Sequence, residues 1–186
     1  CYAPVFLGRA ATLRDPVERL KLVVTSVISG LGNTCSAGKP FNPVLGETFQ
    51  ASFDDGTQVY TEQTSHHPPI TAWQVFGPSN GWKMYGYGEW TATLSTNKAT
   101  GHQKGKFVVE FPADGQRITY TLAKAQVYGL MWGDRIIEYE GELVFEDAGN
   151  NLRCVVQIPV PNTGGGWFSK AKLPSDHFVG DLVRVG

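Results

Sequence analysis

The sequence is poor in charge, in cysteine and in long apolar runs. Only 18% of its 186 residues are charged and the formal net charge is −1 at pH 7, so no broad basic surface is available for nucleic acid or anionic membranes. Cys1, Cys35 and Cys154 are widely spaced and form no C-x-x-C pair, which argues against a disulfide scaffold or structural zinc and favours a reducing compartment. The longest apolar stretch, LKLVVTSVISGL, is too short and too interrupted to span a bilayer, and no signal peptide is evident.

What the sequence does contain is enough apolar and aromatic material for a buried core. Its hydrophobic content is 41%, with five Trp, seven Tyr and ten Phe. This length and composition predict a single soluble domain over residues 1–186. Because the first residue is Cys1 and not Met, we expect the chain to begin inside a longer gene product.

One helix is predicted near the start of the chain. Asp15 suits the N-cap position, Pro16 suits the first helical turn, and Gly30 is a stop signal. Apolar residues recur between them at helical spacing: Val17, Leu20, Val24, Val27 and Ile28. The pattern predicts an amphipathic helix over about residues 16–30 with a single buried face.

After Pro43 the pattern changes to short strand-like runs separated by turns. LGETFQASF and TQVYTEQ, joined by DDG, predict a hairpin. Further strands are predicted in TAWQVF, WKMYGYGEW, KGKFVVEF, RITYTL, IIEYEGELVF and LRCVVQI. We therefore expect at least about eight antiparallel strands, packed as a sandwich or closed into a barrel. The glycines inside WKMYGYGEW favour strong curvature, and hence a barrel that could enclose a ligand.

Two prolines stiffen the segment GKPFNPVLGE, residues 38–47. Lys39 and Asn42 each precede a proline, which pushes a residue toward extended or polyproline conformations. A polyproline helix has about three residues per turn, so Lys39 and Asn42 would point to the same side. This spacing favours a common polar target, and the alternative is a proline-rich connector whose lysine is solvated.

Two adjacent histidines, His66 and His67, lie in EQTSHHPP, between a strand-like run and two prolines. Successive strand residues face opposite sides, so the two imidazoles can share a ligand only where the strand ends. An imidazolium donates hydrogen bonds from both nitrogens, which suits phosphate recognition. A plain polar turn is the alternative. Zinc would need further ligands, and His102 and His177 lie far away in the sequence.

One motif superficially suggests an enzyme. GPSNG matches the nucleophile motif G-x-S-x-G with Ser79 as the nucleophile. A nucleophile elbow leads from a strand into a helix, whereas here Phe76 ends one predicted strand and Trp82 begins the next. There is also no Walker A motif, no complete G-x-G-x-x-G and no convincing pair of catalytic carboxylates. We expect no enzyme, no catalytic residue, no metal and no cofactor.

KPFNPVLGETF and EQTSHHPP together resemble the signature of the oxysterol-binding protein family, and WFSKAKLPSDHFVGDL resembles a stretch that precedes a strand in that family. The resemblance implies a mainly β fold with an N-terminal amphipathic helix. From about residue 44 to residue 186, an antiparallel meander would form an incomplete or nearly closed β-barrel around an apolar tunnel. The family's lid and helical C-terminal part have no counterpart in this sequence, so self-association could be needed to complete the barrel.

The resemblance also implies a ligand and a site. The tunnel would hold one lipid, a sterol or phosphatidylinositol 4-phosphate, and Lys39, Asn42, His66 and His67 would bind the phosphoinositide head group. Glu47 and Glu62 also match the signature, and we assign them to structural hydrogen bonding and not to the lipid.

The function implied is intracellular lipid binding and transfer between membranes, by a cytoplasmic protein that is peripheral to membranes at contact sites. Peripheral membrane contact is expected and nucleic acid is not. The alternative is a lipid-dependent sensor or scaffold without net transfer, and a third hypothesis is a lipid-modifying hydrolase.

Overall fold

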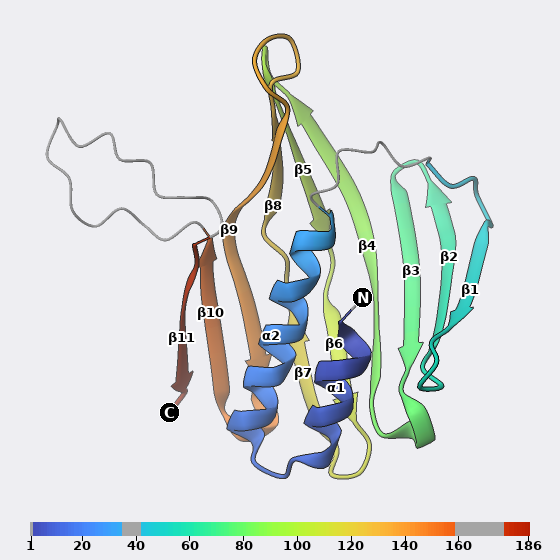
Figure 1. The fold of residues 1–186 in the computed structure, drawn as a ribbon, viewed down its shortest axis with the longest axis vertical. Coiled ribbons are helices and arrows are strands. Elements are labelled where there is room, and N and C mark those ends of the chain that lie inside the picture. Colours follow the sequence, from blue (N-terminus) through green and yellow to red (C-terminus); the bar gives the residue numbers. More distant parts are fainter. Residues whose placement is uncertain (1, 35–41, 159–176) are drawn as a thin grey trace, which may run out of the picture.

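The computed structural model describes residues 2–34, 42–158 and 177–186. Two helices, α1 (Ala3–Thr12) and α2 (Pro16–Thr34), precede the strands of one antiparallel sheet (Figure 1). The strands are β1 (Thr48–Ser52), β2 (Gln58–His66), β3 (Pro69–Phe76), β4 (Lys83–Leu94), β5 (Lys98–Lys104), β6 (Phe107–Phe111), β7 (Gln116–Tyr120), β8 (Lys124–Tyr128), β9 (Ile136–Asp147), β10 (Leu152–Ile158) and β11 (Val179–Arg184).

The strand order confirms the predicted antiparallel meander. It runs β1-β2-β3-β4-β5-β8-β9-β10-β11, while β6 pairs with β4 and β7, and β7 also pairs with β9. The described strands curve into a ring that is not a clean barrel, with β1 and β11 at the two ends of the order (Figure 1). The fold is therefore mainly β with helices at the N-terminus.

The predicted helix is α2, and its start is as expected. The Asp15 Oδ1 atom accepts a hydrogen bond from the Val17 N–H at 2.8 Å, as an N-cap does. The predicted stop at Gly30 is wrong, because α2 continues to Thr34. A glycine inside a helix costs only about 1 kcal/mol, and Leu31 beyond it packs against the core.

A second helix, α1, was not predicted from the sequence. Its buried residues are Ala3, Leu7 and Ala10, which share one face of the helix. Two alanines and one leucine give a weak hydrophobic signal, so the face was not recognised. Among the described residues, no helix is long and apolar enough to cross a membrane.

Strands β5 and β8 were also missed. Their sequences, KATGHQK and KAQVY, are mostly polar and show no clear alternation of apolar residues. They pair with each other and with the longer strands β4 and β9, so their neighbours in the sheet and not their own hydrophobicity define them.

One row of paired side chains crosses the whole sheet on its inner face. Each residue of the row is paired with the next on the neighbouring strand: Phe49, Thr61, Trp73, Gly86, Phe107, Tyr120, Phe145, Cys154 and Leu182. Ring centroids of Trp73 and Phe107 lie 5.5 Å apart, and a Cβ on Gly86 between them would approach the Phe107 ring to 2.9 Å. Glycine is therefore what allows the two rings to stack.

The helices cover only part of this inner face. Leu7 and Leu20 belong to the same buried cluster as Phe107 and Phe145. In Figure 1 the helices lie over β6, β7 and β9, whereas β1, β2 and β3 stand clear of them. At that end of the row Phe49 is 59% exposed. The inner face is thus core at one end and an exposed apolar wall at the other.

A buried arginine fastens the helices to one end of the sheet. Arg19 is 2% exposed, and its guanidinium donates to the main-chain oxygens of Ala10, at 3.1 Å, and Leu13. Its Nη1 atom donates to the Asp114 carboxylate at 2.7 and 2.9 Å and to Gln116 Oε1 at 2.6 Å, both near the β6–β7 turn. Burial alone would raise the pKa of Asp114, but the hydrogen bonds and charge of Arg19 hold the pKa below its ordinary value.

Replacing Arg19 with methionine should lower the free energy of unfolding by about 3 kcal/mol, because the Asp114 carboxylate, two main-chain oxygens and the Gln116 amide oxygen lose their donor. The matched control is Arg14→Met at an exposed position, which should change the free energy of unfolding by less than about 0.5 kcal/mol. Urea unfolding followed by tryptophan fluorescence measures both. A similarly small change in both variants would show that the hydrogen bonds of Arg19 do not contribute to stability.

Candidate functional site

The two histidines lie where β2 ends. His66 is the last residue of β2, and His67 and Pro68, joined by a cis peptide bond, form the turn before β3 begins at Pro69. The ring centroids of His66 and His67 are 4.6 Å apart with an interplanar angle of 67°. The expectation that the strand ends at the histidines is confirmed, and the turn places both imidazoles together.

The hydrogen-bonding capacity of this turn is not used up by the fold. The Nδ1 atom of His66 is buried and has no hydrogen-bond partner among the residues that the structure describes. Buried polar atoms of native proteins normally have a partner. His66 is therefore a point at which an additional polar group would be stabilising.

The segment that carries Asn42 is attached to the histidine strand. Both links are main-chain hydrogen bonds. The Gly46 N–H donates to the main-chain oxygen of Gln63 at 2.8 Å, and the Gln63 N–H donates to the main-chain oxygen of Glu47 at 2.9 Å. The Glu47 carboxylate accepts from the Val44 N–H at 2.9 Å, which is the structural role expected for this residue. Two motifs that are separate in the sequence are thus neighbours in the fold.

The side chain of Gln63 supports the last residues of β2. Gln63 is 2% exposed, its Oε1 atom accepts from the Thr71 hydroxyl at 2.5 Å, and its Nε2 atom donates to the Ser65 oxygen at 2.8 Å. Between Gln63 and Ser65 the register of β2 on β3 shifts, so the amide replaces regular pairing just before His66. The role of Gln63 was not predicted from the sequence, because a strand pattern assigns a residue to a face but gives it no partner.

Three of the four predicted site residues are described. Asn42 is exposed, His66 is half-buried and His67 is exposed, whereas Lys39 lies outside the described residues. His102 lies on β5, separated from β2 by β3 and β4 in the sheet. In the described ranges no group of three His, Cys, Asp or Glu side chains is placed to hold a metal ion.

The uncovered inner wall leads up to the histidine turn. Phe49 is paired with Thr61, which is paired with Trp73. A second paired row, further from the turn, is entirely apolar: Ala51, Val59, Val75 and Met84, of which the last two pack against the buried core. An apolar chain could lie on this wall with a polar group at the turn.

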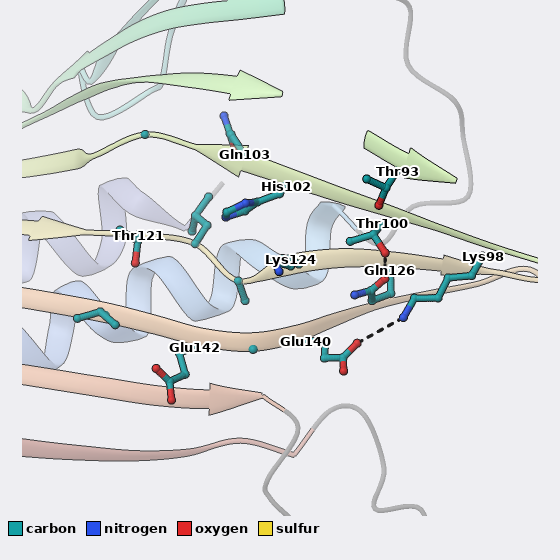
Figure 2. Close-up of a pocket in the computed structure, with 15 residues that line it drawn as sticks. Thr93, Lys98, Thr100, His102, Gln103, Thr121, Lys124, Gln126, Glu140 and Glu142 are labelled. Carbon is teal, nitrogen blue, oxygen red and sulfur yellow. Dashed lines mark hydrogen bonds and ion pairs between the residues drawn. The ribbon is translucent and has the colours of Figure 1, made fainter. Parts of the chain in front are cut away.

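A separate hollow of about 870 Å³ lies between β5, β8 and β9 (Figure 2). Lys98 and Glu140 face it and lie 3.7 Å apart. Glu142 also faces it and alternates along β9 with the buried Leu143, so the hollow opens on the outer face, and Figure 2 shows the helices behind the strands. A polar hollow with charges of both signs does not match the expected apolar tunnel.

His102 lines this hollow without an obvious role. Burial, and then the charges of Lys124 and Lys104, lower the pKa of His102 below its ordinary value of 6.5, so the ring is neutral at pH 7. His102 lies on the outer face, away from the turn, which makes it a suitable control position for substitutions of His66 and His67.

Comparison with known proteins identifies relatives over nearly the whole chain. A family model described as oxysterol-binding protein matches residues 2–173. Oxysterol-binding protein 9 of Dictyostelium discoideum is 40% identical over 187 residues, covering 99% of this chain and 43% of that protein. Human oxysterol-binding protein-related protein 5 is 30% identical over 98% of this chain and 21% of its own length. The chain spans less than half the length of either relative.

Solved structures have a similar fold. The Osh1 ORD domain in complex with ergosterol matches with a TM-score of 0.76 and 28% identity, over 83% of this chain and 38% of that chain. The Osh3 ORD of Saccharomyces cerevisiae, in complex with PI(4)P, matches with a TM-score of 0.74 and 24% identity, over 91% of this chain and 44% of that chain. The second likeness concerns the fold alone.

Replacing Gln63 with leucine should disturb the histidine turn. The Thr71 hydroxyl and the Ser65 oxygen would lose their partner, which should cost about 1–3 kcal/mol of stability and shift the NMR signals of the His66 ring. Gln74→Leu, at an exposed position of β3, is the control and should leave both unchanged. If the two variants give the same His66 spectrum, the support by Gln63 is refuted.

Proposed function

Because the chain belongs to the oxysterol-binding protein family, we propose that it is a cytoplasmic lipid-binding and transfer module, peripheral to membranes, that acts over residues 1–186 as one unit. Its ligands would be a sterol or phosphatidylinositol 4-phosphate. The observation that carries this proposal is the histidine turn at the end of an uncovered apolar wall. A polar clamp beside an apolar surface is the arrangement that an amphipathic ligand requires.

The head group would bind at the turn. His66 and His67 lie side by side at the turn. Asn42 lies on the segment that is hydrogen-bonded to Gln63, and the family signature adds Lys39. Protonated imidazole, ammonium and amide groups all donate hydrogen bonds, and charge-assisted bonds to phosphate are among the strongest. The phosphate would also be the partner that the Nδ1 atom of His66 lacks among the described residues.

The apolar part of the lipid would lie along the inner wall. Phe49 is the most exposed residue of the cross-strand row, and Trp73 lies two strands further in. Covering these side chains with an acyl chain or a sterol removes apolar surface from water, which supplies the driving force for binding. The solved Osh1 ORD complexes with ergosterol and cholesterol support a sterol as one ligand.

We propose no chemical step. Ser79 lies in the short 3-10 turn η1 (Pro78–Asn80) between β3 and β4, whereas a nucleophile elbow leads from a strand into an α-helix. Binding and release alone would carry the lipid from one membrane to another.

Replacing His66 and His67 together with alanine should reduce extraction of phosphatidylinositol 4-phosphate from liposomes by at least about tenfold, because two phosphate donors are lost. Extraction of a fluorescent sterol should stay within about twofold, since a sterol has no phosphate. His102→Ala, in the outer hollow, is the histidine control and should affect neither lipid. Equal loss of both lipids in a folded double variant would disprove the head-group role.

Replacing Phe49 with serine should weaken binding of both lipids by about tenfold, because the wall loses a large apolar contact. The matched control is Tyr60→Ser, since Tyr60 lies on the opposite face of the sheet and is 39% exposed. Equilibrium binding to short-chain phosphoinositide and to sterol measures both variants. A loss in Tyr60→Ser as large as in Phe49→Ser would place the lipid elsewhere.

A further inference from the structure

Two neighbouring hairpin ends expose large apolar side chains. Leu94, at the end of β4, is 80% exposed, and Met131 and Trp132, in the β8–β9 loop, are 73% and 61% exposed. We call these three residues the apolar tip. Figure 1 shows the β8–β9 loop projecting furthest from the sheet, at the same end of the molecule as the β2–β3 turn. The tip and the histidines therefore face the same side.

Asn97 fastens the two hairpin ends together. Its Oδ1 atom accepts from the N–H groups of Met131, at 2.8 Å, and Trp132, at 3.1 Å, and its Nδ2 atom donates to the Trp132 oxygen at 3.0 Å. Its main-chain oxygen accepts from the Gly129 N–H at 3.1 Å. One side chain thus fixes the loop that presents Met131 and Trp132.

These hydrogen bonds bear on whether the apolar tip can enter a lipid bilayer. A main-chain N–H or C=O group without a partner is costly in a lipid environment, since no water is there to replace it. The N–H groups of Met131 and Trp132 and the Trp132 oxygen are satisfied within the protein. These three main-chain groups can therefore leave water without losing a hydrogen bond, which groups bonded only to water could not do.

The side chains of the tip suit a bilayer surface. Tryptophan prefers the interface between head groups and acyl chains, and methionine and leucine partition into the apolar layer. The nearest charges along the two hairpins are Lys98, Asp134 and Arg135, and Lys98 lies 3.7 Å from Glu140, so these four charges cancel. Docking would therefore depend on the apolar side chains and not on attraction to anionic lipid. A projecting tip also fits a deformable bilayer better than the cleft of a protein.

We propose that Leu94, Met131 and Trp132 insert into the interfacial layer of a lipid bilayer and hold the histidine end of the sheet against the membrane. The docking itself is independent of the lipid cargo, and only its purpose, to bring the mouth of the site to the lipid, rests on the proposed function.

The test is binding of the chain to vesicles of phosphatidylcholine and phosphatidylserine that contain no phosphoinositide and no sterol. The double variant Met131→Ser/Trp132→Ser should bind at least about tenfold more weakly. Tyr87→Ser is the control, because Tyr87 is 53% exposed but lies in the middle of β4, and it should bind within about twofold of the parent. Thermal melts should be unchanged, since these side chains are exposed.

Insertion can be distinguished from a general surface effect. In vesicles with brominated acyl chains, the parent should show quenched tryptophan fluorescence, and Trp132→Phe should keep vesicle binding while losing most of the quenching. If the double variant binds like the parent, if Tyr87→Ser loses as much, or if the parent does not bind vesicles, the proposal is overturned.

The membrane-docking proposal and the proposed lipid-binding function can be tested separately. Binding of a soluble short-chain phosphoinositide, measured without vesicles, should be unaffected in Met131→Ser/Trp132→Ser. If the chain binds vesicles but no short-chain phosphoinositide, membrane docking by the apolar tip is supported and the phosphoinositide site is contradicted.

Discussion

Residues paired across neighbouring antiparallel strands lie on the same face of a sheet, and here this constraint runs unbroken from Phe49 on β1 to Leu182 on β11. The helices cover the row where Phe107 and Phe145 lie and leave it open at Phe49. One pattern of alternation therefore builds both the core and the wall that would contact a lipid. Gly86 is part of the same constraint, because any side chain there would separate Trp73 from the core aromatics.

Gln63 connects that sheet to the candidate site. Its main chain binds the Gly46–Glu47 segment, while its amide spans the shift in register that precedes His66. Donors and acceptors of one buried residue thus set the positions of two motifs that are distant in sequence. Groups held in this way lose little conformational freedom when a ligand binds, so more of the contact free energy appears as affinity.

The sequence was informative where a local rule applied and silent where tertiary context decided. Asp15 and Pro16 carry the capping chemistry that starts α2, and the prolines after His67 end β2, so both boundaries were predicted. The end of α2 was not, because packing of Leu31 outweighs the local penalty of Gly30. Helix α1 and strands β5 and β8 have little apolar pattern of their own and are defined by their neighbours. The role of Gln63 depends on partners that no single-sequence pattern reveals.

The two ends of the sheet differ in how fully their polar groups are satisfied, and this difference fits a binding protein. At the end where the helices join, Arg19 binds Gln116, and Gln116 donates to Asp147 at 2.6 Å, which closes a buried network. At the opposite end, His66 has an unpaired buried nitrogen among the described residues, and Trp132 is exposed on a loop that one asparagine holds. The helices are anchored at the end opposite the histidine turn, so the inner face of β1, β2 and β3 stays uncovered beside that turn. A buried polar atom without a partner is stabilised by an additional polar group, so the proposed ligand would bind at the end where the fold leaves such an atom.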